Sequence, residues 1–186
     1  GRLREDPVRM RRATRFQAKL EFSLESDLAS SIRSLGHLLQ DVPPARLFEE
    51  VLKLFLSGYG TAAFDSMIEN DIYGWLFPDS KRSMKNNATE ELVRLALTST
   101  DQRIAKQKPV TPAFIYAAVL WYPFIEEKGR LEQEGEMTYA AAHEAANNVI
   151  SKQQLFTSIP KRFSGPMRDI WFLQSRLRSR FGQKPD

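Results

Sequence analysis

The stretch "PPARLFEEVLKLFLSG" (residues 43–58) decides the fold class. Its apolar residues recur at spacings of three and four and form one stripe, made of Leu47, Val51, Leu54 and Phe55. Pro43 and Pro44 favour the start of a helix at this point, and Gly58 favours its end. The pattern predicts an amphipathic helix with one face packed on a core.

Helical periodicity continues on both sides of this stretch, and no segment alternates apolar and polar residues as a half-buried strand does. The polar stretch "DSKRSMKNNA" (79–88) is the best candidate for a boundary between domains. The sequence predicts an all-α protein of about eight helices, with an N-terminal bundle over residues 1–80 and a second helical domain over residues 81–186. Besides the helix after Pro43, we expect helices near residues 7–20, 26–40, 61–70, 88–105, 111–127, 138–156 and 164–181, and an aromatic turn over "IYGWLFP" (72–78).

Composition and charge narrow the possible functions. Apolar residues make up 42% of the 186, which suits a globular protein, and the absence of cysteine excludes disulfides and thiolate chemistry. No apolar run is long enough to cross a membrane, so we expect a cytoplasmic protein with no membrane partner. The net charge is +4, but residues 1–20 and 161–186 each hold seven lysines and arginines against two acids. Two basic ends favour a polyanionic partner, although solvated helix ends would look the same.

The sequence offers no complete catalytic site. Its only histidines are His37 and His143. We expect His37 to be a half-buried helix residue rather than a base. His143 has no second ligand at metal spacing, so we expect a structural or surface role for it. Phosphate-binding glycine loops and zinc-protease motifs are absent too. We therefore predict no catalytic residue and no metal ligand in this chain.

The stretch "EDPVRMRRATRF" (5–16) concentrates charge at the start of a predicted helix. Asp6, Arg9 and Arg12 are spaced by three residues and so lie near one another on that helix. A carboxylate beside a guanidinium offers an acceptor next to a donor, which complements the Watson–Crick edge of adenine and also that of cytosine. An ordinary Asp–Arg salt bridge within the helix fits the same spacing.

The longer stretch "EDPVRMRRATRFQAKLEF" (5–22) closely resembles the neck motif of class II nucleotidyltransferases, the bacterial poly(A) polymerases and CCA-adding enzymes. The resemblance implies that Asp6 and Arg9 recognise the base of the incoming nucleotide. It also implies that Glu5 holds Arg9 and that Arg12 supports the nucleotide pocket.

Three later stretches resemble the poly(A) polymerase branch in particular. They are "VPPARLFEEVLKLFLSGYG" (42–60), "TPAFIYAAVLWYPF" (111–124) and "SIPKRFSGPMRDIWFLQSRL" (158–177). The first implies that Arg46 and Glu50 support the base-recognising helix, while a simple i,i+4 ion pair between them fits as well.

By this resemblance the chain comprises the neck (1–80) and part of the body (81–186) of an ATP-specific polynucleotide adenylyltransferase that extends RNA 3′ ends without a template. ATP would be its substrate, and Mg²⁺ would bind in a catalytic head preceding residue 1. Further body helices would follow Asp186. Phosphates of the RNA would meet basic residues of the last segment, with Lys161, Arg162, Arg168 and Arg176 as the candidates. The alternatives are a CCA-adding enzyme, whose bases the same pair accepts, and a non-catalytic all-α RNA-binding module.

Overall fold

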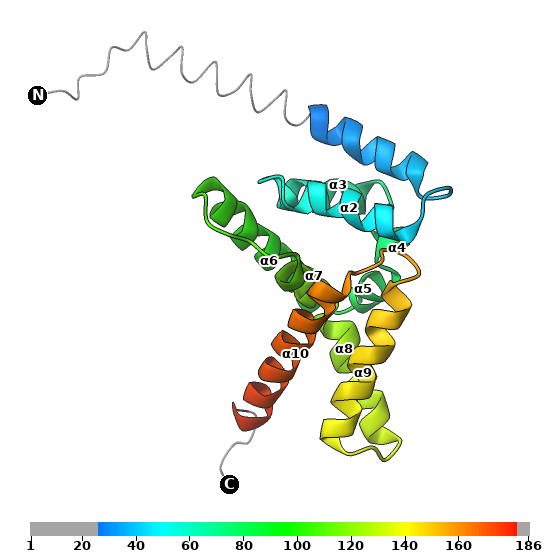
Figure 1. Ribbon diagram of the computed structural model, residues 1–186, viewed down its shortest axis with the longest axis vertical. Helices are drawn as coiled ribbons and strands as arrows, with labels where there is room; N and C mark the ends of the chain where they lie inside the picture. The colour runs from blue at the N-terminus through cyan, green and yellow to red at the C-terminus, as the bar shows by residue number, and fades with distance from the viewer. Residues whose placement is uncertain (1–25, 182–186) are drawn as a thin grey trace, which may run out of the picture.

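The computed structural model describes residues 26–181 and confirms the all-α prediction, since no strand occurs among them. A first helix covers residues 26–38, and the helix expected over 7–20 lies outside the described residues. Nine labelled helices follow (Figure 1). They are α2 (Pro44–Phe55), α3 (Gly60–Glu69), α4 (Tyr73–Leu76), α5 (Pro78–Ser83), α6 (Asn87–Ala105), α7 (Pro112–Val119), α8 (Trp121–Gln133), α9 (Thr138–Gln153) and α10 (Lys161–Phe181).

The predicted stripe of α2 faces the core. Its four residues are buried, and Phe48 joins them as a fifth. Pro44 opens the helix at a position where the missing N–H would have had no partner, and Gly58 follows its end with φ of 88°. The sequence therefore predicted both the course of this helix and its buried face.

The single helix expected over residues 111–127 is instead two helices, α7 and α8. Thr111 caps α7 by accepting a hydrogen bond from the amide of Ala113 at 3.3 Å. The chain leaves helical geometry at Leu120, and Pro123 then stands in the first turn of α8. A proline ring inside a continuous helix would clash with the carbonyl four residues earlier, so the break before Pro123 removes that conflict.

Short helices occupy two segments for which the sequence predicted other structures. α4 lies within the expected aromatic turn, and α5 lies at the start of the polar stretch 79–88. Two serines of α5 are buried, because Ser80 hydrogen-bonds the hydroxyl of Tyr73 at 2.8 Å and Ser83 donates to Glu126 at 3.0 Å. Small polar side chains can enter a core when their hydroxyls find partners, which is why this polar stretch still packs.

The residues on either side of position 80 belong to one hydrophobic cluster. The ring of Phe48 on α2 lies 5.2 Å from that of Tyr116 on α7. The buried amide of Gln153 donates to the carbonyl of Leu76 at 2.7 Å. The division at residue 80 stays a prediction, and across it the two parts pack closely.

The C-terminal part is an α8–α9 hairpin with α10 beside it (Figure 1). α8 ends at a left-handed Gly135 (φ 100°), where the amide of Glu136 donates back to the carbonyl of Leu131 at 3.1 Å. α10 begins at Lys161, three residues before the predicted start, and it includes Pro166. Trp171 attaches α10 to α7, since its ring is fully buried and its Nε1–H donates to the carbonyl of Ala117 at 2.9 Å.

Candidate nucleic-acid interface

The predicted base-recognition residues Glu5, Asp6, Arg9 and Arg12 lie outside the described residues. The structure describes the chain from residue 26 onward, which follows them in the sequence. The helix over residues 26–38 lies against α2, and a hollow of about 260 Å³ between them is lined partly by Glu50 and Lys53. Of the two predicted supporting residues, Glu50 borders this hollow and Arg46 does not.

Arg46 and Glu50 are one turn apart on α2, but they do not form the ion pair that their spacing allows. Glu50 instead accepts a hydrogen bond from Lys53 at 3.1 Å. The guanidinium of Arg46 is exposed, and among the described residues it pairs with no carboxylate. Their support of the base-recognising helix stays a prediction.

The four predicted RNA-binding cations all lie on α10, and three of them contact neighbours there. Lys161 and Arg162 are exposed at its start, where the guanidinium of Arg162 lies 4.7 Å above the ring of Phe163. Arg168 is half-buried and donates to the Oδ1 of Asn147 on α9. Arg176 is exposed, and its Nε donates to a backbone carbonyl one turn back at 3.3 Å. These positions give α10 positive charge over most of its length.

Aromatic side chains that the sequence did not single out lie next to these cations. His143, for which we expected a structural or surface role, lies between the rings of Tyr139 and Phe172, with both centroid distances at 4.4 Å. Tyr139 is 78% exposed, and no reason for this appears in the sequence of α9 alone. The available signal was spacing, because Tyr139 and His143 on α9, and Phe172 and Arg176 on α10, are each four residues apart. The other histidine, His37, lies on the helix over residues 26–38, and the expectation that it is half-buried is wrong, because its position faces away from the core and is exposed.

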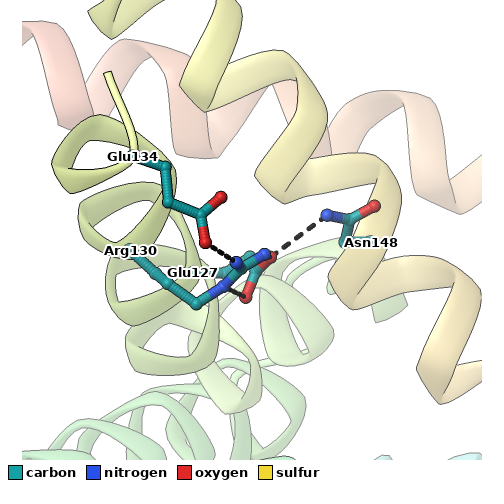
Figure 2. A network of polar contacts seen from close by, with 4 residues as sticks. All are labelled: Glu127, Arg130, Glu134 and Asn148. Carbon is teal, nitrogen blue, oxygen red and sulfur yellow. Dashed lines mark hydrogen bonds and ion pairs between the residues drawn. The ribbon is translucent and has the colours of Figure 1, made fainter. Parts of the chain in front are cut away.

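Elsewhere on the α8–α9 hairpin, an acidic–basic network joins the two helices (Figure 2). Glu127 accepts hydrogen bonds from Arg130 at 3.1 Å through Nε and from Asn148 at 3.1 Å, while Arg130 also pairs with Glu134 at 2.7 Å. Hydrogen bonding from the Arg130 guanidinium lowers the pKa of Glu127 despite its partial burial. The network holds Glu127 ionised and fixes the hairpin from which Tyr139 extends.

A second acidic contact lies near the α8–α9 turn. Hydrogen bonding with Glu144, reinforced by desolvation, raises the pKa of Glu136, and one carboxylate oxygen of Glu136 is buried without a hydrogen-bond partner. Within residues 26–181, no three histidine, aspartate or glutamate side chains come together as metal ligands. None of the helices in this range is both long and apolar enough to cross a membrane.

Two family models match the chain. Residues 21–84 match one described as "Probable RNA and SrmB- binding site of polymerase A", and residues 134–186 match one described as "Polymerase A arginine-rich C-terminus". The second match includes α9, α10 and all four predicted RNA-binding cations.

Several bacterial proteins that are similar to this chain are named "Poly(A) polymerase I". The chain is 42% identical over 98% of its length to "Poly(A) polymerase I" of Escherichia coli O6:H1, and 39% identical over 99% to that of Haemophilus influenzae. It is 34% identical over 67% of its length to a "CCA-adding enzyme" of Streptococcus pneumoniae. The chain spans about 40% of the poly(A) polymerase relatives' length and 29% of the CCA-adding relative's. It belongs to the bacterial poly(A) polymerase I family, and it corresponds to that family's RNA-binding and arginine-rich regions.

Proposed function

We propose that this chain is the nucleotide-recognition and RNA-binding part of a template-independent polynucleotide adenylyltransferase, which adds AMP from ATP to RNA 3′ ends. The observation that carries the proposal is the row of cations along α10. It occurs in a chain that is similar over 98% of its own length to part of poly(A) polymerase I. Cations that contact phosphates bind RNA without regard to base sequence, as an enzyme acting on many RNA ends requires.

The two ends of the chain have different roles, base recognition at the N-terminal end and RNA-backbone binding at the C-terminal end. Asp6 and Arg9 recognise adenine, with Glu5 and Arg12 supporting them, and the neck (1–80) holds this group. Lys161, Arg162, Arg168 and Arg176 on the body (81–186) contact the RNA backbone near its 3′ end.

Two residues of α2 are assigned to the support of the base-recognising helix. The exposed guanidinium of Arg46 is available to a neighbouring segment, and Glu50 lines the hollow between α2 and the helix over residues 26–38. We assign Mg²⁺ and the transfer step to a catalytic head of the family's kind. The chain by itself is then inactive.

RNA binding can be tested on the chain directly. Fluorescence anisotropy with labelled oligo(A) at several salt concentrations measures how the logarithm of affinity falls with the logarithm of salt. Replacing both Lys161 and Arg162 by Gln removes two phosphate contacts, which lowers the slope by about 1.4 for a single strand. The matched control replaces Lys106 and Lys108, two exposed lysines after α6, and should leave the slope unchanged. An absence of binding, or equal slopes for both double variants, would reject the proposal.

Base recognition needs the catalytic head, so it is tested in a chimera in which this chain replaces its counterpart in the Escherichia coli relative. Asp6→Ala or Arg9→Ala should each reduce discrimination between ATP and UTP or GTP by about 1–3 kcal/mol, the value of a bidentate base contact. Single-turnover incorporation with each nucleotide measures the discrimination, and unchanged selectivity contradicts the assignment.

The same chimera tests the second candidate, a CCA-adding enzyme. The similarity to the Streptococcus pneumoniae enzyme over 67% of the chain favours considering it. Because the Asp–Arg pair accepts cytosine as well as adenine, incorporation of CTP as efficient as that of ATP would support CCA addition. If the chimera binds RNA but transfers no nucleotide, a non-catalytic RNA-binding module is the remaining candidate.

A further inference from the structure

A series of aromatic rings in contact, of which only the innermost pair is stacked, runs from the core to the surface where α8, α9 and α10 meet. In the core, the rings of Trp171 and Phe124 are stacked with centroids 4.8 Å apart, and Phe172 packs on Phe124 at 6.4 Å. His143 and then Tyr139 continue the series, each 4.4 Å from the ring before it. Each ring rests on the next, so the outermost ring is held in place although 78% of Tyr139 is exposed.

Tyr139 borders a hollow of about 490 Å³ between these three helices. Tyr139, His143 and Phe172 form its aromatic side, and Lys128 and Arg176 contribute positive charge. Lys128 is paired with Glu132 at 3.0 Å, while none of the described residues that line the hollow carries a carboxylate. The volume lies within the range of small-ligand sites, and the combination of ring faces with cations suits an anion that carries a flat ring.

Along α10, the cation Arg168, the ring of Phe172 and the cation Arg176 follow one another at intervals of four residues, and each lies toward α9. Asn147 faces Arg168 through a hydrogen bond, and His143 faces Phe172 one turn further along. Another turn brings Tyr139 and Arg176 to the same hollow. Arg168 and Arg176 are eight residues apart on one helix, which is about 12 Å along its axis. Two cations at this separation can contact different phosphates of one strand, with an aromatic face between them.

We propose that this hollow holds one nucleotide of single-stranded RNA, with its base stacked on Tyr139 and its flanking phosphates contacted by Arg168 and Arg176. The inference rests on the proposed RNA-binding function and adds a specific site to it. Stacking accepts any base, because every base has a flat aromatic face, and it requires an unpaired strand whose bases are not covered. A contact made only with phosphates would need no ordered ring beside the cations.

The test uses the whole chain and an oligo(A) probe that contains 2-aminopurine, whose fluorescence is quenched by stacking. Tyr139→Leu removes the ring but keeps a branched apolar side chain at this position. It should weaken binding by at least about fivefold, at the low end for base–aromatic stacking, and abolish the quenching. Tyr139→Phe keeps the ring and should retain both affinity and quenching. Trp75→Leu is the matched control, since Trp75 is 66% exposed on α4 and does not border the hollow.

Two further measurements separate stacking from charge. Tyr139→Leu should leave the salt dependence of binding unchanged, whereas Arg176→Gln should lower its slope by about 0.7, one phosphate contact. An oligonucleotide with abasic ribose at every position should bind wild type and Tyr139→Leu equally.

The possible failures are distinct. Wild-type chain that binds no oligo(A) overturns the proposed function together with this inference. Wild-type chain that binds oligo(A) as tightly as Tyr139→Leu does, or as tightly as it binds the abasic strand, overturns only the stacking site.

Discussion

α2 and α10 place their apolar residues differently. α2 buries five of its twelve residues on one face. Among the described side chains of the 21-residue α10, only Met167 and Trp171 are buried, while Leu173 and Leu177 are 52% and 38% exposed. α2 is therefore part of the core, and α10 is attached to the core near its middle and offers its remaining surface, with its cations, to a partner. α2 lies among the helices α2–α7, whereas α10 lies beside the α8–α9 hairpin.

The most severe test of this contrast removes the attachment of α10. Trp171→Ala deletes a fully buried indole and its hydrogen bond to Ala117, so it should lower the free energy of unfolding by about 3–5 kcal/mol. Trp75→Ala, at a ring that is 66% exposed, should cost far less. Urea titration followed by circular dichroism measures both. Equal losses in the two variants would show that α10 has other strong attachments.

Among helices α2–α7, a carboxylate of one helix caps the start of another. Asp101 on α6 accepts hydrogen bonds from the amides of Gly60 at 2.7 Å and Thr61 at 3.1 Å, the first residues of α3. Asp101→Ala leaves these amides without acceptors and should cost about 1–2 kcal/mol of unfolding free energy, as the loss of a helix cap does. Asp101→Asn keeps one acceptor oxygen and should cost less. If both variants unfold at the wild-type urea concentration, the cap contributes nothing.

A substitution just after α6 should stabilise the fold without changing the core face of α2 or the cationic surface of α10. Gln107 is exposed and holds φ of 55°, while the amide of Lys108 donates to the carbonyl of Arg103 at 2.8 Å. Glycine adopts this left-handed conformation without strain, so Gln107→Gly should raise the unfolding free energy by about 0.5–1 kcal/mol. Gly135→Ala makes the reverse change at the end of α8, where a Cβ would meet no atom within 4 Å. Opposite shifts in thermal midpoint are expected, and shifts of the same sign would contradict this explanation.

The smallest expected effect concerns the α8–α9 hairpin and depends on pH. Arg130 lowers the pKa of Glu127 in the folded chain, so Glu127 stabilises the fold above about pH 4.3, its ordinary value in an unfolded chain. This contribution is lost as the pH falls through the lower folded pKa. Glu127→Gln should therefore lower the thermal midpoint slightly at pH 7, and the difference from wild type should vanish in acid. A difference that persists at the lowest pH at which both proteins fold would argue for another cause.

The sequence predicted helices well and their junctions less well. The stripe of α2, its start at Pro44 and its end before Gly58 follow from nearby residues, so local periodicity and chemistry were sufficient to predict them. The break at Leu120 was also encoded locally, by Pro123, but an apolar run on both sides concealed it. The packing of Ser80 and Ser83 could not be predicted, because their partners Tyr73 and Glu126 include a residue 43 positions away.

The candidate site also contains residues that the sequence predicted and residues that it did not. Lys161, Arg162, Arg168 and Arg176 were chosen from charge, and the structure places all four on one helix. Tyr139 and Phe172 were missed, since an aromatic residue in an amphipathic helix is ordinarily part of the core. Only the packing of α9 against α10 shows that Tyr139 is exposed and lies beside cations.

By itself, the sequence determined that the chain is helical, which faces of its helices are apolar and that its ends are basic, because these properties depend on residues within a turn or two of one another. The family resemblance also depends on such short stretches. The tertiary structure decided which helix ends are capped from a distance, where the two predicted domains touch, and that Tyr139, His143, Phe172 and Arg176 border one hollow. These contacts join residues far apart in the chain, and their geometry depends on how whole helices pack.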